Sequence, residues 1–379
     1  MLFARAELGR SKLRFGLLTL GAGLLVFVLL FQQLLLGTVL DGMTGAIAHQ
    51  SAPVLVLARQ AQRSVTGSLV RDDQLDAVAA QPGVEDAAEL AVTMLSFQGE
   101  GEPEDSWHEV AVFGYQPGRA GEPTNLRSGR LPEESNEVVV SAEDATGRFG
   151  IGDTVTVEPS AMQLTVVGLT EGSRYNVSPT LWVPWPTYEV LASAATPELG
   201  LVLPSAVAVK PAPGTDPDAL VADINALDPN LEALTRQDAV DTAPGRDSVR
   251  LAFMVVIGLG YLVVAVVIGF FFLTLTLQKE PAITLLRAVG SPQGYLVRGL
   301  ILQVAIVTVG GLAIGVALAY AAAPVLSSTV PVTIEPRALG MSALSAMGVA
   351  LLGAVSPVRR VLRADPYTVV SRPSLGGLG

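Results

Sequence analysis

The sequence contains no cysteine and only two histidines, His49 and His108. Without cysteine, no disulfide holds the chain together and no thiolate can act as a metal ligand or nucleophile. Two histidines are too few for a histidine-rich metal centre, and we find neither metal-ligand spacing nor a nucleophile elbow. The G-x-x-x-x-G-K-[ST] loop that cradles ATP phosphates is also missing. We therefore expect no catalytic residues, no histidine-rich metal site and no cofactor in this chain, and we expect that it is not an enzyme.

Charged residues make up only 16% of the 379 residues, whereas hydrophobic residues make up 50%. Four stretches contain no Asp, Glu, Lys or Arg, namely 15–40, 251–278, 299–334 and 338–358. Each is longer than the roughly 18 apolar residues that predict a membrane-spanning helix. The third stretch is too long for one span and contains Pro324 and Pro331, so its helix is expected to end at residue 323. The sequence therefore predicts four transmembrane helices.

The positive charges near these stretches define an orientation. Lys and Arg residues precede the first stretch, lie between the second and third, and follow the fourth, so these flanks belong in the cytoplasm. Residues 41–250 then lie outside, with 12 Lys or Arg against 31 Asp or Glu. The net charge of −11 for the whole chain comes from this one segment and does not indicate nucleic-acid binding. Both termini are expected to be cytoplasmic.

The expected fold is an α-helical membrane protein with one large α/β extracytoplasmic domain inserted between transmembrane helices 1 and 2. The predicted segments are a cytoplasmic or interfacial N-terminal helix (1–14), the first span (15–40), the extracytoplasmic α/β domain (41–250), the second span (251–278), a cytoplasmic helical segment (279–298), the third span (299–323), an outer loop (324–337), the fourth span (338–358) and a cytoplasmic tail (359–379). A cleaved signal peptide is the alternative for the N-terminus, because residues 46–48 read Ala-Ile-Ala. The 26 residues of the first uncharged stretch exceed the usual length of a signal-peptide core.

The extracytoplasmic segment has the patterns of alternating strands and helices. Its 210 residues are enough to bury a core without disulfides. Apolar runs and period-two alternation predict strands over 53–58, 85–97, 137–141, 152–159 and 162–168, the last two forming a hairpin. Helices are predicted over 72–84, ending at Pro82-Gly83, and over 215–230, with Asp216 as N-cap and Pro217 at the first helical position. Residues 114–136 are expected to be loop, 241–250 a polar hinge, and His108 an ordinary residue at an edge or in a loop.

A short helix is predicted between the second and third spans. Glu280 and Pro281 suit its first turn, because a carboxylate favours the positive end of the helix dipole and proline is tolerated there. Leu285 and Leu286 belong to an apolar stripe, and a cation at Arg287 is favourable near the C-terminal end. Gly290 then supplies a left-handed stop. From these residues alone, the helix could be a connector on the membrane surface.

Several motifs together resemble a known family. The run QKEPAITLLRAVGSPQGYLVRGLILQ is similar to the cytoplasmic segment of MacB/FtsX-type (type VII) ABC transporter permeases. QPGVEDA (81–87), SGRLPEESNEVVVS, FGIGDTVTV and LTVVG resemble the core of the periplasmic-type domain of this family. Arg10-Ser11-Lys12-Leu13-Arg14 and Val358-Arg359-Arg360-Val361 resemble its two ends. No one motif decides the matter, but their order and the topology cover nearly the whole chain.

The resemblance implies a non-catalytic permease subunit in a bacterial plasma membrane, paired with a second copy of itself and with a separate ABC ATPase that binds ATP and magnesium. The segment around Glu280, Leu285, Leu286, Arg287 and Gly290 would be the coupling helix that docks into the ATPase. ATP-driven closure of the ATPase would then tilt the spans and move the outer domain, which is the mechanotransmission scheme of the family. The other expected partner is membrane lipid, with no nucleic acid.

The candidate substrate site lies where the first span meets the outside. Gln32 and Gln33 are polar within a Leu-rich helix, and their amides are expected to find a partner such as the dimer mate. Met43 and His49 follow shortly after. The run FVLLFQQLLLGTVLDG resembles the haem-efflux branch of the family. That resemblance makes haem the first candidate substrate, with Met43 and His49 as candidate iron ligands. The alternative is that the glutamines only hold helices together and that Met43 and His49 have no ligand role.

Gly311 and Gly315 form a small-xxx-small pair in the third span, for which helix packing is the expected use. The function predicted overall is export of a hydrophobic or amphipathic compound from the membrane. The alternatives are an FtsX-like signalling complex that regulates an extracytoplasmic cell-wall hydrolase, or the handling of lipoproteins or peptides.

Overall fold

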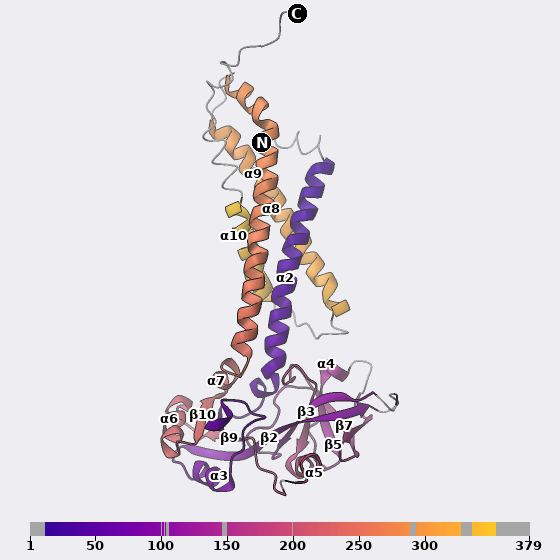
Figure 1. Ribbon diagram of the computed structural model, residues 1–379, viewed down its shortest axis with the longest axis vertical. Helices are drawn as coiled ribbons and strands as arrows, with labels where there is room; N and C mark the ends of the chain where they lie inside the picture. The colour runs from indigo at the N-terminus through magenta and orange to yellow at the C-terminus, as the bar shows by residue number, and fades with distance from the viewer. Residues whose placement is uncertain are drawn as a thin grey trace, which may run out of the picture. The chain divides into compact units, whose positions relative to one another are not determined.

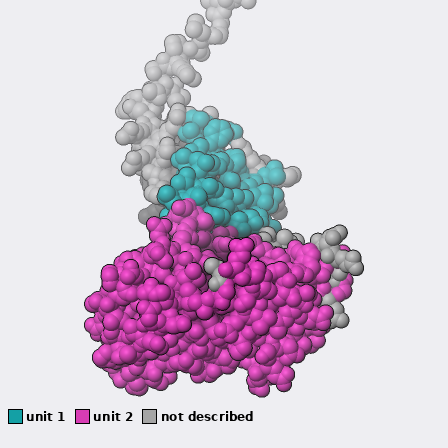
Figure 2. Space-filling view, turned by 60° about the horizontal axis from the view of Figure 1, so that its bottom comes forward, with its two compact units in different colours: residues 1–36, 251–379 teal, residues 37–250 magenta. Residues whose placement is uncertain are grey.

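The computed structural model of the protein describes residues 12–99, 101, 103, 106–145, 150–198, 200–288, 293–326 and 336–353. The chain divides into two compact units, one formed by residues 1–36 and 251–379 and the other by residues 37–250 (Figure 2). Four parts of the predicted chain lie outside the described residues: residues 1–11 of the N-terminal helix, Gly290, residues 327–335 of the outer loop and the tail over 359–379.

The unit of residues 37–250 is built on one mixed ten-stranded sheet (Figure 1). Its strands are β1 (Val54–Ala58), β2 (Val84–Gly99), β3 (His108–Tyr115), β4 (Leu126–Gly129), β5 (Glu137–Ser141), β6 (Thr154–Glu158), β7 (Met162–Thr170), β8 (Thr180–Pro184), β9 (Ala206–Pro211) and β10 (Leu231–Thr235). The order across the sheet is β10-β1-β9-β2-β3-β8-β5-β7-β4, and β6 pairs with β2 and β7. Most neighbours are antiparallel, but β3 with β8 and β5 with β7 are parallel.

Short helices lie between the strands. They are the 3₁₀ helix η1 (Arg59–Ala61), α3 (Asp72–Ala79), α4 (Ala142–Ala145), α5 (Trp185–Ala195), α6 (Pro217–Leu227) and α7 (Arg236–Asp241). Alternate residues of β1 enter different cores, since side chains in a strand point to opposite faces. In β1, Val54 and Val56 join the core under α3 and α6, whereas Leu55 and Leu57 join a core on the other face of the sheet. A third core lies under α5.

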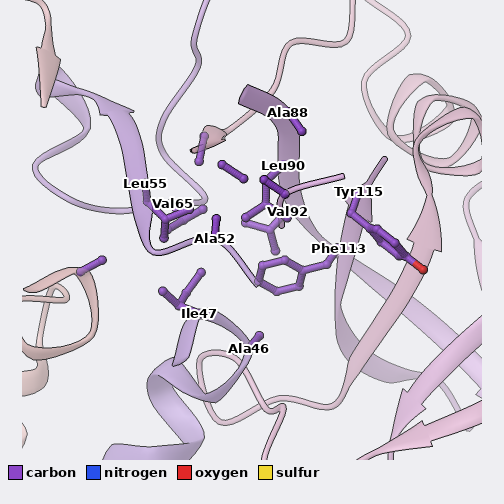
Figure 3. Close-up of a cluster of buried hydrophobic side chains, with 14 of the residues drawn as sticks. Ala46, Ile47, Ala52, Leu55, Val65, Ala88, Leu90, Val92, Phe113 and Tyr115 are labelled. Atoms are coloured by element: carbon purple, nitrogen blue, oxygen red, sulfur yellow. The ribbon is translucent and has the colours of Figure 1, made fainter. Parts of the chain in front are cut away.

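The core that contains Leu55 and Leu57 also receives Ala46 and Ile47, which come from the end of the first long helix (Figure 3). Ile47 is 2% exposed, and Phe113 of β3 in the same core is fully buried. Burying an isoleucine side chain contributes about 1.5–3 kcal/mol. The end of this helix is therefore part of the folded extracytoplasmic unit.

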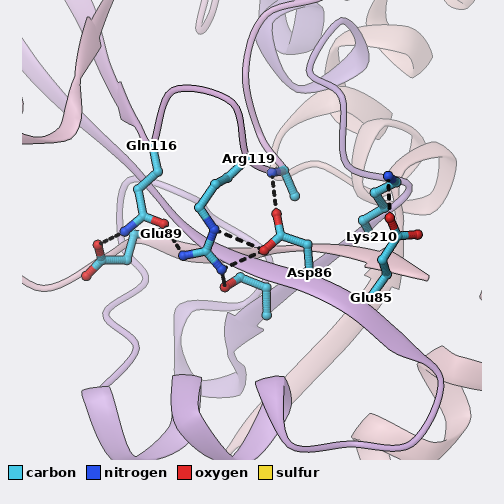
Figure 4. A network of polar contacts seen from close by, with 8 residues as sticks. Glu85, Asp86, Glu89, Gln116, Arg119 and Lys210 are labelled. Carbon is cyan, nitrogen blue, oxygen red and sulfur yellow. Dashed lines mark hydrogen bonds and ion pairs between the residues drawn. The ribbon is translucent and has the colours of Figure 1, made fainter. Parts of the chain in front are cut away.

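Ion pairs brace the surface near the start of β2 (Figure 4). The guanidinium of Arg119 donates to Asp86, whose other carboxylate oxygen accepts the Ala120 N–H at 2.8 Å. Gln116 donates to Glu89 at 2.6 Å, and burial together with the negative charge of Glu189 raises the pKa of Glu89. These contacts fix the QPGVEDA segment against the loop that follows β3.

Most strands and helices expected in this unit are found. The strands β1, β2, β5, β6 and β7 and the helices α3 and α6 occupy the predicted segments, and β6 pairs with β7 as a hairpin. The region 114–136, expected to be loop, contains β4 and the end of β3. His108 begins β3 and pairs with Phe97 of β2, so it lies within the sheet.

The other unit contains long helices. They are α2 (Lys12–Ala48), α8 (Arg246–Ala288), α9 (Gln293–Leu326) and α10 (Pro336–Gly353), of which α2 and α8 continue into the extracytoplasmic unit. Three described helical segments are long and apolar enough to cross a membrane: Phe15–Ala48, Arg246–Thr274 and Ala305–Ala322. The apolar part described in α10 is shorter, Gly340–Val349, so the count of four spans stays a prediction.

The helix boundaries differ from those expected. Because α8 continues through Glu280 and Pro281 to Ala288, the expectation that a separate helix begins at Glu280 is wrong. Likewise, α2 continues to Ala48 past residue 40, the predicted end of the first span, and α8 begins at Arg246 within the predicted hinge.

Glycines allow α9 to pass close to α2. A Cβ at Gly311 would lie 2.9 Å from the Cβ of Ala22, and one at Gly315 would lie 2.7 Å from Cγ1 of Val26. Since real Cβ atoms do not make contacts this short, any larger residue would push the two helices apart.

Candidate functional site

The glutamine pair of α2 faces α8. Gln33 Nε2 donates a hydrogen bond of 2.8 Å to the Tyr261 hydroxyl of α8. That hydroxyl lies 2.5 Å from the Ser345 hydroxyl of α10, so three helices meet in one polar chain. Hydrogen bonds between membrane helices contribute on average about 0.6 kcal/mol each. The partner of Gln33 is therefore within the same chain, and no second copy is needed to satisfy it.

Gln32 packs against the same helix but is not satisfied. A Cβ at Gly260 of α8 would lie 3.6 Å from Gln32 Oε1, which places the amide beside this glycine. Gln32 Oε1 is buried and has no hydrogen-bond partner among the described residues. A buried polar atom without a partner is costly in hydrocarbon surroundings and marks a place for a donor from outside the described chain.

Met43 and His49 belong to the extracytoplasmic unit. Met43 lies in the last turns of α2, and its Cε would lie 3.7 Å from a Cβ at Gly245, immediately before α8. The Met43 side chain thus packs against the turn that begins α8. Its thioether is only partly buried, and thioethers are soft ligands of the kind that bind haem iron.

His49 follows the last residue of α2 and is exposed. Its Nδ1 lies 3.0 Å from the carbonyl oxygens of both Gly45 and Gly172. Because two acceptors surround Nδ1, this nitrogen carries the proton in the neutral ring, and Nε2 keeps its lone pair. A histidine held by a backbone carbonyl at one nitrogen is the common arrangement of a metal-binding histidine.

The four candidate substrate-site residues divide between the two units of the chain. Gln32 and Gln33 lie in the membrane unit, whereas Met43 and His49 lie in the unit of residues 37–250. No group of three or more His, Cys, Asp or Glu side chains within the described ranges could hold a metal ion. For the predicted coupling residues, the backbone of Glu280, Leu285, Leu286 and Arg287 lies in α8, and nothing is described of their side chains.

Three residues that belong to the polar chain of Gln33 or contact the end of α2 were not identified from the sequence. Tyr261 and Ser345 lie in apolar helices, where a single hydroxyl gives no pattern to read. Arg246 was taken as part of a polar hinge, but its guanidinium donates to the Leu40 carbonyl at 2.6 Å and to the Thr44 hydroxyl at 3.1 Å. Its position directly before the second uncharged stretch was the feature of the sequence that could have indicated a role for Arg246 at the start of the membrane helix.

Comparison with known protein families covers nearly the whole chain. Residues 16–227 match the model of the MacB-like periplasmic core domain, and residues 254–366 match the FtsX-like permease C-terminal model. The chain belongs to the MacB/FtsX-type ABC transporter permeases. It is accordingly a membrane protein with an extracytoplasmic α/β domain, and permeases of this family are non-catalytic transmembrane subunits of ABC transporters.

Individual relatives fall into two groups. The "Putative hemin transport system permease protein HrtB" of Staphylococcus haemolyticus is 25% identical over 250 residues, which are 65% of this chain and 66% of that protein. The match therefore spans just under two thirds of the length of this relative. An uncharacterized ABC transporter permease of Mycobacterium tuberculosis (strain H37Rv) is 26% identical over 305 residues, 80% of this chain and 79% of that protein.

Solved structures of extracytoplasmic domains are distantly similar. The periplasmic region of MacB from Actinobacillus actinomycetemcomitans has a TM-score of 0.36 and 12% identity, and covers 52% of this chain and 94% of that one. The extracellular domain of the ABC-type transporter YknZ from Gram-positive bacteria has a TM-score of 0.34 and 12% identity, and covers 48% and 99%. The family assignment rests on the sequence models.

Proposed function

We propose that this chain is the permease subunit of an ABC efflux system that works by mechanotransmission. In this proposal two copies assemble with a separate ATPase and export a hydrophobic or amphipathic compound from the membrane. One observation carries the proposal. The two permease family models match this chain one after the other, over residues 16–227 and 254–366. The sequence also has long apolar helices and no phosphate loop. In this proposal the energy for transport comes from the separate ATPase.

Haem is the first candidate cargo. The support is the haem-transport name of the Staphylococcus relatives together with the polar side chains near the outer end of α2. An amphipathic cargo carries polar groups on an apolar body, and Gln32 Oε1 offers a buried acceptor without a partner among the described residues. His49 Nε2 and the Met43 thioether would be the iron-binding groups. The candidate cargo residues remain Gln32, Gln33, Met43 and His49.

The proposed contact with the ATPase is the end of α8. Residues Glu280, Leu285, Leu286, Arg287 and Gly290 would dock into it. The continuity of α8 from Arg246 to Ala288 supports this assignment, because a rigid helix passes a displacement at one end to the other without loss in a flexible joint. Both termini would then be cytoplasmic.

The test is ATP hydrolysis by this chain reconstituted in lipid nanodiscs with its neighbouring ATPase, with and without haem. We expect haem to stimulate hydrolysis, and His49→Ala or Met43→Ala to weaken the stimulation. His108→Ala is the matched control, because His108 pairs within the sheet as part of β3.

Each other outcome discards a defined part of the proposal. A complex that hydrolyses ATP but ignores haem would discard haem as cargo and keep the permease. A complex that responds to no compound, but whose outer domain binds a cell-wall hydrolase tightly, would replace efflux with FtsX-like signalling.

A further inference from the structure

The loop of residues 171–178, called the clasp below, holds the end of α2. Tyr175 and Ser178 bond each other through both backbone groups, at 3.3 and 3.0 Å. The two residues between them, Asn176 and Val177, have φ values of 52° and 66°, as in a type I′ turn. The second of these positions usually holds glycine, because a β-branched residue is strained there. Their N–H groups donate to α2, from Asn176 to Met43 O at 3.1 Å and from Val177 to Gly42 O at 2.8 Å.

The last turns of α2 make close backbone contacts with the clasp. Ala46 N donates to Arg174 O at 3.0 Å, and Thr44 forms an antiparallel bridge with Tyr175. Gly45 faces Gly172, and a Cβ at Gly45 would collide with the Gly172 carbonyl oxygen. Only glycine allows this approach, which explains a glycine inside the last turns of a helix. By contrast, a Cβ at Gly37 of the same helix would meet nothing within 4 Å.

The clasp is also bound to the sheet and to α4. Arg174 forms a two-point ion pair with Asp144 of α4, and the two side chains are 16% and 6% exposed. The Ser141 hydroxyl donates to the same carboxylate at 2.7 Å. Gly172 N donates to a carboxylate oxygen of Glu143. The clasp therefore links α2 to β5 and α4 through buried, charge-assisted hydrogen bonds.

A second connection ties α8 to α2. The guanidinium of Arg246, the first residue of α8, donates to the Leu40 carbonyl and the Thr44 hydroxyl of α2 at 2.6 and 3.1 Å. Thr44 is 3% exposed, so this bond is shielded from water. The end of α2, the start of α8 and the sheet are thus joined within residues 37–250.

We propose that the clasp and Arg246 form a joint that stays closed throughout the transport cycle, with Gly45 and Arg246 as positioning residues. The ends of α2 and α8 and the extracytoplasmic domain then move as one body, so tilting of either helix is delivered to the domain undiminished. This inference rests on the proposed function. It assigns to Gly45 and Arg246 the coupling of ATP hydrolysis to transport, and no contact with the cargo.

The first experiment closes the joint covalently. A Cβ at Gly42 would lie 3.7 Å from Val177 Cα and 3.9 Å from Val177 Cγ1, so side chains at these two positions would be in contact. The chain has no native cysteine, so the double variant Gly42→Cys/Val177→Cys reports on this pair alone. We expect oxidant to crosslink it completely, both at rest and after trapping with MgATP and vanadate. The crosslinked complex should keep the haem-stimulated ATP hydrolysis of the reduced one. Absence of the crosslink, or crosslinking that stops turnover, would overturn the closed joint.

The second experiment loosens the joint. Gly45→Ala and Arg246→Met should retain basal ATP hydrolysis and lose most of the stimulation by haem, which a merely structural role would not separate. The controls are Gly37→Ala and Arg250→Met, one turn further along α8. Stimulation that is equal in variants and controls would refute the positioning role. If the unmodified complex ignores haem, the proposed cargo fails, and the crosslinking under vanadate trapping still decides whether the joint opens.

Discussion

Glu137→Gln should destabilise the extracytoplasmic domain at neutral pH and remove part of its sensitivity to acid. Glu137 begins β5 and its side chain is 10% exposed. Arg130 donates to both of its carboxylate oxygens, and the backbone N–H groups of Glu133 and Glu134 donate to Oε2 at 2.9 and 3.2 Å. The hydrogen bonds from Arg130, followed by those from the two N–H groups, lower the pKa of Glu137 from 4.5 to about 2.

The magnitude follows from this pKa. Because one pKa unit corresponds to 1.36 kcal/mol, the fall from 4.5 to about 2 sets an upper bound of about 3 kcal/mol. The Arg130 side chain is 48% exposed, so water screens the pair and we expect about 1–2 kcal/mol. The folded state binds the Glu137 proton less readily than the unfolded state. Its stabilisation is therefore complete above pH 4.5 and is lost as the pH falls from 4.5 towards 2.

The sequence provides a direct assay. All three tryptophans, Trp107, Trp182 and Trp185, lie between residues 41 and 250, so tryptophan fluorescence of the full chain in detergent reports on this domain. Thermal unfolding followed from pH 7 to pH 3 should give a midpoint about 2–8 °C lower for the variant at pH 7, since 1 kcal/mol corresponds to about 2–4 °C in a domain of this size. The two curves should converge at low pH.

Glu133→Gln is the matched control, because only the backbone of Glu133 contacts Glu137. It should behave like the unmodified protein. Equal midpoints for Glu137→Gln and the unmodified protein at pH 7, or an unchanged difference down to pH 3, would refute the reasoning.

Three further predictions concern the membrane unit. Tyr261→Phe removes the acceptor of Gln33 and should weaken helix association by about 0.6 kcal/mol, measured by unfolding in detergent; an unchanged stability would show that this bond contributes nothing. Gly311→Lys should prevent assembly of the membrane unit, measured by gel filtration, because α9 touches α2 there. Gly21→Ala should assemble normally, because the space around Gly21 is open. Equal assembly of the two variants would remove the packing argument. Arg287→Ala should keep the permease assembled but uncouple ATP hydrolysis from haem, and full coupling in this variant would count against the docking of α8 into the ATPase.

The extent of the strands could be read from the sequence where the pattern was strong. The run Val54–Ala58 and the hairpin of β6 and β7 have the apolar or alternating patterns of buried and half-buried strands. β4 was missed because its four residues, Leu126–Gly129, are all exposed and lie in a stretch rich in glycine and proline. β8 was missed because the five residues Thr180–Pro184 end in a proline. β4 has no pattern of its own, since it is defined by its neighbours in the sheet.

The sequence by itself determined the class of protein, because uncharged runs long enough to cross a bilayer and the acidic segment between two of them follow from composition along the chain. It also identified Gln32 and Gln33 as unusual, since amides are rare in a Leu-rich helix. Only the tertiary structure decided that the residues after position 40 continue the helix α2. A helix containing Gly42 and Gly45 has weak intrinsic stability, and α2 continues through them to Ala48 because the loop of residues 171–178 bonds its backbone. That partner lies more than 120 residues away in the chain, and local patterns carry no information about contacts at such separation.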